Sequence, residues 1–467
     1  MANRAILAAL IVVVELLVGS DCQSYERSRD IEAVSPKRHP NNFDTKVDGS
    51  KNSLHVFKES SEALLSHPDI LKGGRTSQTN THDVIFVVHG KNMDELTRIL
   101  HDVSDPLSVN YGNHLTRQEI DDLTSNPDSR KEVIAYLRAA GVTVLPDELS
   151  GECILARAEI KLWERILNTE FHTYSFQSTD DVIIRADEYS IPVGLDQHVE
   201  SVLNTVQFPH AMADRPQPRR IGNIDSIRTS RFSEASEYWE GYTTPQLLND
   251  AYFIDDNSGH PRATQAAFEG WYNYFSPEDL TKFQNTFGLP VVPANKTIGN
   301  HTATAAWCKR KGYEPCAEGN LDMMYIMAMA TTPTYFYWSP FPTFGQWLQF
   351  LVNDKTPPPL VISISYGSEE KNIGKAELKI FLDNAIKLGV MGTTILSASG
   401  DDGASATAAR TDSRKCGYSP LWPTTCPYVV SVGATQVNFD FNVTCEGYFY
   451  YYRLAVLRFV PFSDTRR

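Results

Sequence analysis

Alternating apolar and polar runs between residues 80 and 208 predict a compact domain of helices and strands. A strand is predicted at HDVIFVVHG, and a helix at NMDELTRILHDVSDP, where Leu96, Ile99, Leu100 and Val103 recur at helical spacing. Further along the chain, a helix that stops at a glycine and leads into a strand is predicted at PDSRKEVIAYLRAAGVTVL. Strand, helix and strand are predicted at ECILARAEIKLWERILNTEFHTYSF. This order favours a ferredoxin-like double βαβ unit.

A different pattern extends over residues 241–447, where apolar runs end in small residues and alternate with helical segments. The candidate strands are TPTYFYW, PPLVISISYG, VMGTTILSASGDDG and YVVSVGAT, and one candidate helix is AELKIFLDNAIKLG. Continuous apolar runs indicate strands that are covered on both faces. This region is therefore predicted to be an α/β domain with a mostly parallel sheet flanked by helices.

Residues 209–240 lie between these two regions and are predicted to be an exposed linker. They are rich in proline and arginine and contain few apolar residues. The pair Arg219–Arg220 is either a processing site or a plain pair of linker arginines. The bond cleaved on maturation is left open within about 210–240.

The N-terminus has the pattern of a secretory signal peptide over residues 1–20, with one arginine, an apolar run and then small residues. The apolar run is too short to span a bilayer, so no membrane anchor is expected after cleavage. Residues 21–79 are predicted to be a polar leader with a short ordered piece near LHVFKESSEALLSH. The expected location is the cell exterior or a lysosome-like acidic compartment.

The remaining composition bears on partners and on oxidation state. The net charge of −14 repels phosphate backbones, so nucleic acid is not expected as a partner. In an exported chain, Cys308 with Cys316 and Cys416 with Cys426 are close enough in sequence to form disulfides, whereas Cys445 has no obvious partner. Glycosylation sequons lie at Asn295, Asn300 and Asn442.

Two carboxylates open the apolar helical run CAEGNLDMMYIMAMA. Glu318 and Asp322 are four residues apart, so they share one face of a helix. Most acidic pairs at this spacing lie on a solvated surface. The next turns, however, have almost no polar face, which predicts a buried helix whose acids point at a metal, a cation or a catalytic partner.

A second candidate site is SASGDDGAS, which follows the predicted strand TTILSA. Sites in open α/β sheets form at the carboxyl ends of strands. The alternative is a tight turn in which an aspartate only caps the backbone. Beyond residue 230 the only histidines are His260 and His301, and His301 is expected on a surface loop. A Ser-His-Asp triad is therefore not expected, and a glutamate base would favour acidic conditions.

Four motifs resemble the sedolisins, the serine-carboxyl peptidases, especially their tripeptidyl-peptidase branch. EGNLD resembles the Glu-x-x-x-Asp helix motif, and SASGDDGAS resembles the Ser-Gly-Asp turn. VISISYG resembles the strand that lines the substrate cleft, and DPLSVNYGNHLTRQEI resembles the signature of the activation prodomain. The motifs occur in the family order and cover about residues 80 to 447.

The resemblance implies a subtilisin-like α/β fold with a Ser-Glu-Asp triad, preceded by an activation prodomain at 80–208. Glu318 would be the general base for a nucleophilic serine, and Asp322 would orient Glu318. Asp401, protonated in acid, would donate a hydrogen bond to the tetrahedral oxyanion. Peptides or proteins would be cleaved through an acyl-enzyme, by internal cleavage or by release of tripeptides. The residues expected along the substrate cleft are Ser365, Tyr366, Gly367, Ser399 and Gly400.

The family's nucleophilic serine lies in a Gly-Thr-Ser segment after the Ser-Gly-Asp turn, and that string does not occur in this chain. Ser405 is a weak substitute. The atypical tail at 448–467 is expected to reflect a truncated product or an altered reading frame, with a genuine edge strand as the alternative. The family's calcium loop would also follow this point, so no cofactor is expected in the chain itself.

Three interpretations therefore stand. The first is an acid-acting peptidase proenzyme, inactive as given because the serine is missing, whose prodomain acts as an intramolecular inhibitor. The second is a non-catalytic exported protein that binds a partner or acts as a decoy. The third treats Glu318 and Asp322 as metal ligands, although the histidines or additional carboxylates that such a site needs are lacking.

Overall fold

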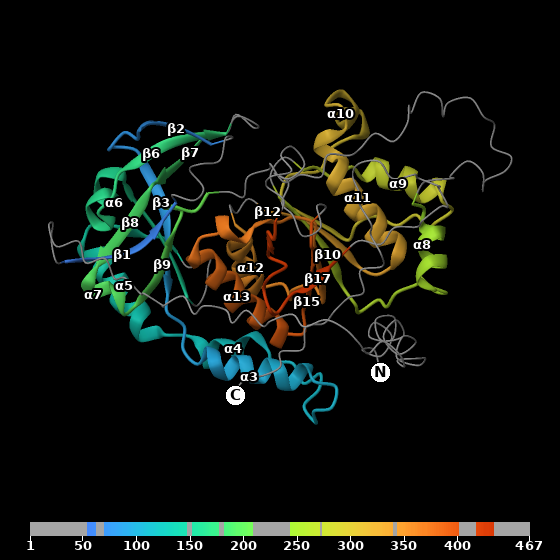
Figure 1. Ribbon diagram of the computed structural model, residues 1–467, viewed down its shortest axis with the longest axis horizontal. Helices are drawn as coiled ribbons and strands as arrows, with labels where there is room; N and C mark the ends of the chain where they lie inside the picture. Colours follow the sequence, from blue (N-terminus) through green and yellow to red (C-terminus); the bar gives the residue numbers. More distant parts are fainter. Residues whose placement is uncertain are drawn as a thin grey trace, which may run out of the picture.

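The computed structural model describes residues 54–61, 70–146, 152–176, 182–208, 243–270, 273–339, 343–400 and 417–433 (Figure 1). We call the described residues up to 208 the first domain and those from 243 onward the second domain. The first domain lies beside the second, with two helices of the second domain between its own sheet and the first domain (Figure 1).

The first domain is built on a four-stranded antiparallel sheet in the order β4-β5-β3-β9. Its strands are β3 (Thr81–Val88), β4 (Thr143–Val144), β5 (Cys153–Glu159) and β9 (Val199–Leu203). Its helices are α3 (Met93–Ser104), α4 (Arg117–Thr124), α5 (Pro127–Ala139), α6 (Ile160–Leu167) and α7 (Val193–Asp196). The helices and strands predicted in this region are confirmed, since α3 buries Leu96, Leu100 and Val103 as expected.

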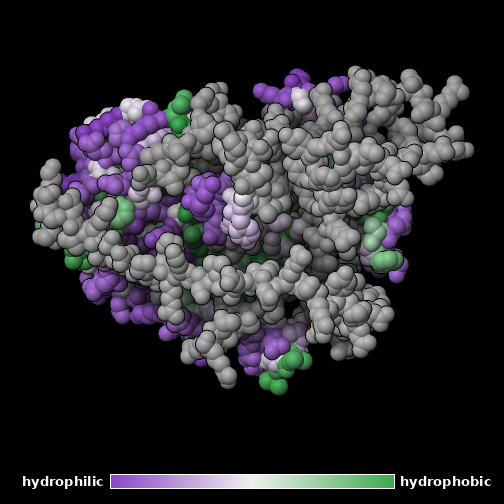
Figure 2. All heavy atoms as spheres, in the orientation of Figure 1, coloured by the Kyte–Doolittle hydropathy of each residue, from purple (hydrophilic) through white to green (hydrophobic). Residues whose placement is uncertain are grey.

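Two smaller sheets complete the first domain. One is three-stranded in the order β2-β6-β7, and the other pairs β1 with β8. Their strands are β1 (His55–Ser60), β2 (Ile70–Arg75), β6 (Phe171–Phe176), β7 (Val182–Ala186) and β8 (Glu188–Pro192). Strands β1 and β2 lie within the segment 21–79, and both pair with strands from beyond residue 170. Figure 2 shows the described surface of this domain as mainly hydrophilic.

Local sequence signals set the helix ends of the first domain. Thr116 begins α4 with a capping box, in which its side chain accepts from the Glu119 backbone and the Glu119 side chain accepts from the Thr116 backbone. Pro127 lies in the first turn of α5, where its missing N–H costs nothing. Gly141 has a φ of 89° just after α5, which confirms the predicted glycine stop.

The second domain contains a six-stranded sheet in the order β11-β12-β10-β13-β15-β17, and every pair of neighbours in it is parallel. Its strands are β10 (Gln265–Gly270), β11 (Lys296–Ile298), β12 (Thr334–Ser339), β13 (Val361–Ile364), β15 (Thr394–Ala398) and β17 (Val430–Val432). A separate antiparallel pair is formed by β14 (Ser368–Glu369) and β16 (Leu421–Trp422). The predicted parallel α/β sheet is thus confirmed.

Helices cover both faces of this sheet (Figure 1). They are α8 (Pro245–Tyr252), α9 (Pro277–Thr286), α10 (Ala305–Arg310), α11 (Glu314–Met329), α12 (Phe344–Asn353) and α13 (Lys375–Val390), and a short 3-10 turn spans Glu370–Asn372. Neighbouring residues of β10 alternate between the faces, since Ala267 packs with α9 and α11 whereas Phe268 packs with α12 and α13. The central strands are therefore buried on both sides, as their continuous apolar runs predict.

The first domain docks on α13. Its sheet residues Ile85, Val87 and Leu203 form an apolar cluster with Ile380 of α13. Its helices form a second cluster, in which Leu96 and Leu100 pack with Ile386 and Val390. In the part of the chain that the structure describes, no helix is long and apolar enough to cross a membrane.

Candidate active site

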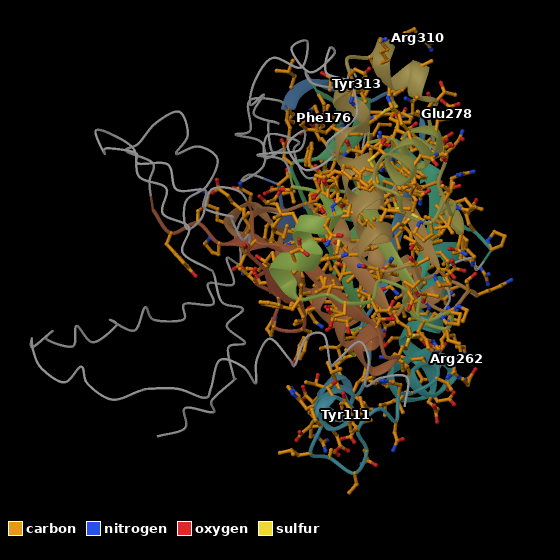
Figure 3. The ribbon with its side chains drawn as sticks, turned by 90° about the vertical axis from the view of Figure 1, so that its right-hand side faces the viewer. Tyr111, Phe176, Arg262, Glu278, Arg310 and Tyr313 are labelled. Carbon is orange, nitrogen blue, oxygen red and sulfur yellow. A yellow bond between two sulfur atoms is a disulfide. The ribbon has the colours of Figure 1, made fainter. Side chains whose placement is uncertain are left out.

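Helix α11 holds the predicted carboxylate pair on one face. Glu318 and Asp322 are both part of its helical run, four residues apart, so their side chains leave the same side. The start of the helix is fixed by the disulfide between Cys308 of α10 and Cys316, which confirms that predicted pairing. Figure 3 places Tyr313, just before α11, beside Arg310 at one end of the molecule.

The prediction that this helix is buried holds for one face only. Met323 and Met327 are buried against the sheet, whereas Leu321 is 51% exposed. The neighbouring turns are only half-buried because α11 lies on the outside of the sheet as its covering layer. Apolar composition around the whole circumference therefore did not distinguish a central helix from a covering one.

Asp322 meets two groups from the carboxyl ends of neighbouring strands. Its side chain hydrogen-bonds to Ser365, which follows β13, and to Glu269 near the end of β10. Burial raises the pKa of Asp322 to about 6, although both hydrogen bonds act in the opposite direction. The carboxyl of Asp322 therefore changes its charge in mildly acidic conditions.

Glu269 is a fully buried carboxyl that the sequence analysis missed. Its residue has no exposed surface, and its Oε2 accepts a hydrogen bond from the Tyr366 hydroxyl. The Asn273 amide in turn donates to the Tyr366 hydroxyl oxygen. Burial, followed by the charge of Asp322, raises the pKa of Glu269 well above its usual range. The pKa of the Tyr366 hydroxyl is raised in the same way, chiefly by burial and by Glu269.

Glu269 and Asp322 share one hydrogen bond, and that bond requires a proton. It raises the pKa of Glu269 and lowers the pKa of Asp322. Within the described residues, no N–H or O–H group of a third residue reaches Glu269 Oε1 or Asp322 Oδ2. Two adjacent buried carboxylates would repel each other, and a shared proton removes that repulsion.

A local signal for Glu269 exists in the sequence. All six residues of β10 are buried, and the glutamate is the only charged one among them. A charged residue inside a buried strand has to find a partner, since an unpaired buried charge is costly. The apolar pattern did not predict a strand at this position, so the buried glutamate was not recognised.

The remaining predicted cleft residues lie at the same edge of the sheet. Ser365, Tyr366 and Gly367 follow β13, and Ser399 and Gly400 follow β15. Strands β10, β13 and β15 are adjacent and parallel, so their carboxyl ends meet at one edge. These residues are thus brought to the same edge as Glu269.

The turn after β15 is held closely against the antiparallel pair. Gly400 has a φ of 89°, a conformation that favours glycine, and a Cβ atom there would collide with Leu421. The Ser399 N–H donates to the Val432 carbonyl at 2.9 Å. Asp401, Cys416, Ser405, Asn442 and Cys445 lie outside the described residues.

The two other sequons flank the edge strand β11. Asn295 precedes it and exchanges hydrogen bonds with Thr334, donating through its backbone N–H and accepting at its side-chain oxygen. Asn300 follows the strand and is exposed. His301 is less open than expected for a surface loop, because its ring stacks on Trp338 with centroids 3.5 Å apart. Burial lowers the pKa of His301 to about 4.

Comparisons with known proteins show which proteins this chain resembles. A model of the pro-kumamolisin activation domain matches residues 68–208. Tripeptidyl-peptidase 1 of Canis lupus familiaris is 28% identical over 391 residues, which are 80% of this chain and 65% of that protein. Physarolisin of Physarum polycephalum is 28% identical over 393 residues, which are 80% of this chain and 62% of that protein. The chain thus resembles tripeptidyl-peptidase 1 and physarolisin over 80% of its length, and it contains a match to the pro-kumamolisin activation domain.

A solved structure of Pseudomonas sedolisin, a serine-carboxyl proteinase in complex with two molecules of pseudo-iodotyrostatin, covers 40% of this chain and 52% of its own. The identity is 19% and the TM-score is 0.31. The chain spans 65% of the length of the tripeptidyl-peptidase relative. The activity of a whole sedolisin is therefore a matter for proposal.

The match to the activation domain coincides with most of the first domain. The match begins at residue 68 and so includes β2, whereas β1 lies before it. The predicted prodomain start at residue 80 falls inside the match. Family and structure thus agree that an activation domain precedes the parallel sheet.

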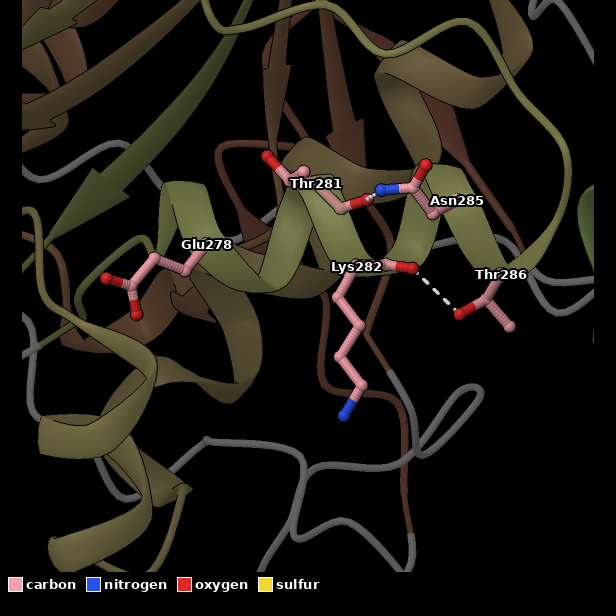
Figure 4. A pocket seen from close by; sticks show the side chains of 5 residues that line it. All are labelled: Glu278, Thr281, Lys282, Asn285 and Thr286. Atoms are coloured by element: carbon pink, nitrogen blue, oxygen red, sulfur yellow. Dashed lines mark hydrogen bonds between the residues drawn. The ribbon is translucent and has the colours of Figure 1, made fainter.

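The other candidate sites lack functional groups that converge on a ligand. In the described part of the chain, no group of three His, Cys, Asp or Glu residues is arranged to hold a metal ion. A surface depression of about 630 Å³ lies along α9 and is lined by Glu278, Thr281, Lys282, Asn285 and Thr286 (Figure 4). Three of these side chains, those of Thr281, Asn285 and Thr286, donate to carbonyls of the same helix, so they stabilise α9 and do not converge on a ligand.

Proposed function

We propose that this chain is the proenzyme of an acid-acting serine-carboxyl peptidase that hydrolyses peptide bonds through an acyl-enzyme. The observation that carries the proposal is the hydrogen bond between the buried Glu269 and Asp322, one helical turn from Glu318. A peptidase that uses a glutamate base needs its supporting acid to keep a proton at working pH. The raised pKa of Asp322, about 6, meets that need in mild acid.

Roles within the site follow from position and charge. Glu318 is the general base that accepts the proton of the nucleophilic serine. Asp322, one helical turn further along α11, orients Glu318. Glu269 supplies the proton that keeps Asp322 from repelling Glu318. Asp401, protonated in acid, is the donor to the oxyanion. Ser365 through Gly367 and Ser399 with Gly400 form the strand ends along which a substrate peptide lies.

The finer fold assignments belong to this proposal. A subtilisin-like arrangement is supported by the parallel six-stranded sheet with helices on both faces. A ferredoxin-like prodomain is supported by the antiparallel sheet order β4-β5-β3-β9, in which the two edge strands come second and last in the chain. That order and its two crossing helical segments match a double βαβ unit.

The prodomain is proposed to act as an inhibitor within the chain until it is cleaved in the linker at 209–240. Its docking on α13 is supported by polar contacts as well as by the two apolar clusters. The Lys387 ammonium lies 2.7 Å from a Glu152 carboxylate oxygen, and Lys379 lies 3.1 Å from Glu200. The Leu115 N–H donates to the Val390 carbonyl at 2.8 Å. Peptides are the proposed substrates, in an acidic compartment or outside the cell.

The family's Gly-Thr-Ser string does not occur in these 467 residues. The first test is therefore to sequence the transcript from the codon of Gly447 onward. A frame that continues into a Gly-Thr-Ser segment supports the peptidase. A message that ends at Arg467 withdraws the activity from this chain and supports the second candidate, a non-catalytic exported protein that binds a partner or acts as a decoy.

The second test uses the encoded proenzyme after acid activation, assayed on a fluorogenic peptide with a free N-terminus. Glu318→Gln is expected to reduce kcat by roughly 10²- to 10⁴-fold, because the base is lost while its size is kept. The matched control is Glu278→Gln on α9, an exposed carboxyl whose acceptor for the Ala305 N–H is retained. Equal activity of the two variants would contradict the role of Glu318.

A further inference from the structure

The N-terminus of helix α13 has no cap of its own. Gly374 occupies the N-cap position with φ −65° and ψ 148°, and it has no side chain to accept the first backbone N–H groups. Exposed N–H groups at a helix start need an acceptor, and a side-chain oxygen at the N-cap usually provides it. In α13 this acceptor has to come from another part of the chain.

The missing acceptor comes from the first domain. Glu59, near the end of β1, accepts a hydrogen bond from the backbone N–H of Ala376, the second residue of α13. The Gln207 amide holds the same carboxyl in place by donating to Glu59 Oε2 at 2.8 Å. Glu59 is 9% exposed, so the contact is largely shielded from water. The β1 segment therefore reaches across the domain boundary to a helix start.

Gly374 is the residue that allows this approach. A Cβ atom at this position would collide with Glu59 Oε1. Its backbone angles are ordinary for any residue, so only the approaching carboxyl requires glycine here. Gly374 therefore has two effects: it provides no side-chain cap, and it leaves space for the Glu59 carboxyl.

The residue that could close a capping box within α13 is used elsewhere. Glu377 holds the third helical position, yet its Oε1 accepts from the Gly345 N–H of α12 at 2.7 Å. The start of α12 therefore has two acceptors, its own N-cap Thr343 and Glu377 of α13, whereas the start of α13 is capped from the first domain. This chain of carboxyl contacts links β1 to both helices that cover one face of the parallel sheet.

We propose that Glu59 acts as the N-cap of α13, supplied by the first domain of the same chain, and that the first domain thereby completes α13 and positions the α12–α13 layer. Its partner surface is the bare helix start at Gly374 to Ala376. Glu59 precedes the matched activation domain, which begins at residue 68. The inference rests on contacts within the chain and is independent of peptidase activity.

The test is residue-resolved hydrogen exchange of the full chain at neutral pH, read at the Ala376 amide. Glu59→Ala is expected to speed exchange there by roughly 2- to 30-fold, the range that corresponds to the loss of one N-cap. Glu59→Gln keeps an acceptor oxygen and is expected to retain most of the protection. The matched control is Glu200→Ala, which removes a different contact of the first domain with α13, the one with the half-exposed Lys379.

A rescue variant separates capping from general loosening of the interface. In the Glu59→Ala background, Gly374→Ser meets no carboxyl and supplies a hydroxyl at the N-cap. Slow exchange at Ala376 is expected to return in this double variant. The proposal is overturned if the rescue fails, or if Glu200→Ala speeds exchange at Ala376 as much as Glu59→Ala does.

Discussion

Glu269 of β10 and Asp322 of α11 form a carboxyl–carboxyl hydrogen bond at the edge of the parallel sheet. In the described residues, no lysine, arginine or histidine forms an ion pair with either side chain. The charge of Asp322 is therefore controlled by a proton rather than by a cation. This arrangement suits a site that works in acid, where such a proton is available.

The first prediction concerns the pKa of Asp322. Glu269→Met removes the hydrogen bond and fills the same space with an apolar side chain of similar size. The pKa of Asp322 is therefore expected to rise above about 6. Glu269→Gln keeps a donor to Asp322 and is expected to leave that pKa at about 6 or lower it. The measurement is a carboxyl infrared titration, with the Asp322 band assigned by difference against Asp322→Asn. The same pKa in both variants would show that the hydrogen bond is not formed.

The second prediction concerns stability against pH. Burial raises the pKa of Glu377 from 4.5 to about 8, and hydrogen bonds from Thr343 and Gly345 only partly oppose the shift. The folded state binds the Glu377 proton more tightly than the unfolded chain does. This difference stabilises the fold fully below pH 4.5, and the stabilisation is lost as the pH rises through 8. The slope is at most about 1.4 kcal/mol per pH unit.

Urea unfolding of the wild type and of Glu377→Gln between pH 5 and pH 8 measures this term. The variant keeps an acceptor for the Gly345 N–H and cannot titrate, so the advantage of the wild type is expected to shrink as the pH rises. The difference between the two proteins is needed because His82 acts in the opposite direction. Burial lowers the pKa of His82 to about 4. The contribution of neutral His82 to the stability of the fold is therefore present above pH 6.5 and is lost as the pH falls below that value. A difference that does not change with pH would contradict the prediction.

Much of the second domain could be predicted from the sequence because parallel strands that are buried on both faces leave continuous apolar runs. Four of the six strands were found in this way, and Glu318 and Asp322 were placed on one helix face. Strand β10 was missed because QAAFEG is short and contains small residues and a charge. Its partner Tyr366 was recognised only as part of a cleft strand. The pairing of Glu269 with Asp322 depends on strand order, which local periodicity does not specify.

The third prediction concerns the disulfide that anchors the start of α11. Cys308 and Cys316 close a short loop between α10 and the turn that carries Glu318. Replacing both by serine is expected to lower the free energy of unfolding by about 2–3 kcal/mol, mainly through the freedom gained by the unfolded chain. Urea unfolding without reductant measures the loss. Added reductant serves as the control, since it is expected to lower the stability of the wild type and leave the double variant unchanged; an equal response of both would contradict the assignment.

The fourth prediction concerns the ion pair across the two domains. The side chains of Lys387 and Glu152 are 5% and 11% exposed, and their charged atoms are 2.7 Å apart. Removing one partner leaves a buried charge without its counterion, so Lys387→Met is expected to cost about 3–5 kcal/mol. Glu152→Gln in the Lys387→Met background removes the stranded charge and is expected to recover part of that loss.

A double-mutant cycle on the full chain measures the coupling between these two residues. The matched pair is Lys379 with Glu200, which lies on the same helix surface but whose lysine is 49% exposed. Its coupling is expected to stay below about 1 kcal/mol because water screens an exposed ion pair. If Lys379 and Glu200 are coupled as strongly as Lys387 and Glu152, burial does not determine which contact holds the first domain on α13. If only the buried pair is strongly coupled, release of the first domain has to break the contact at Lys387, and that step requires rehydration of both charges.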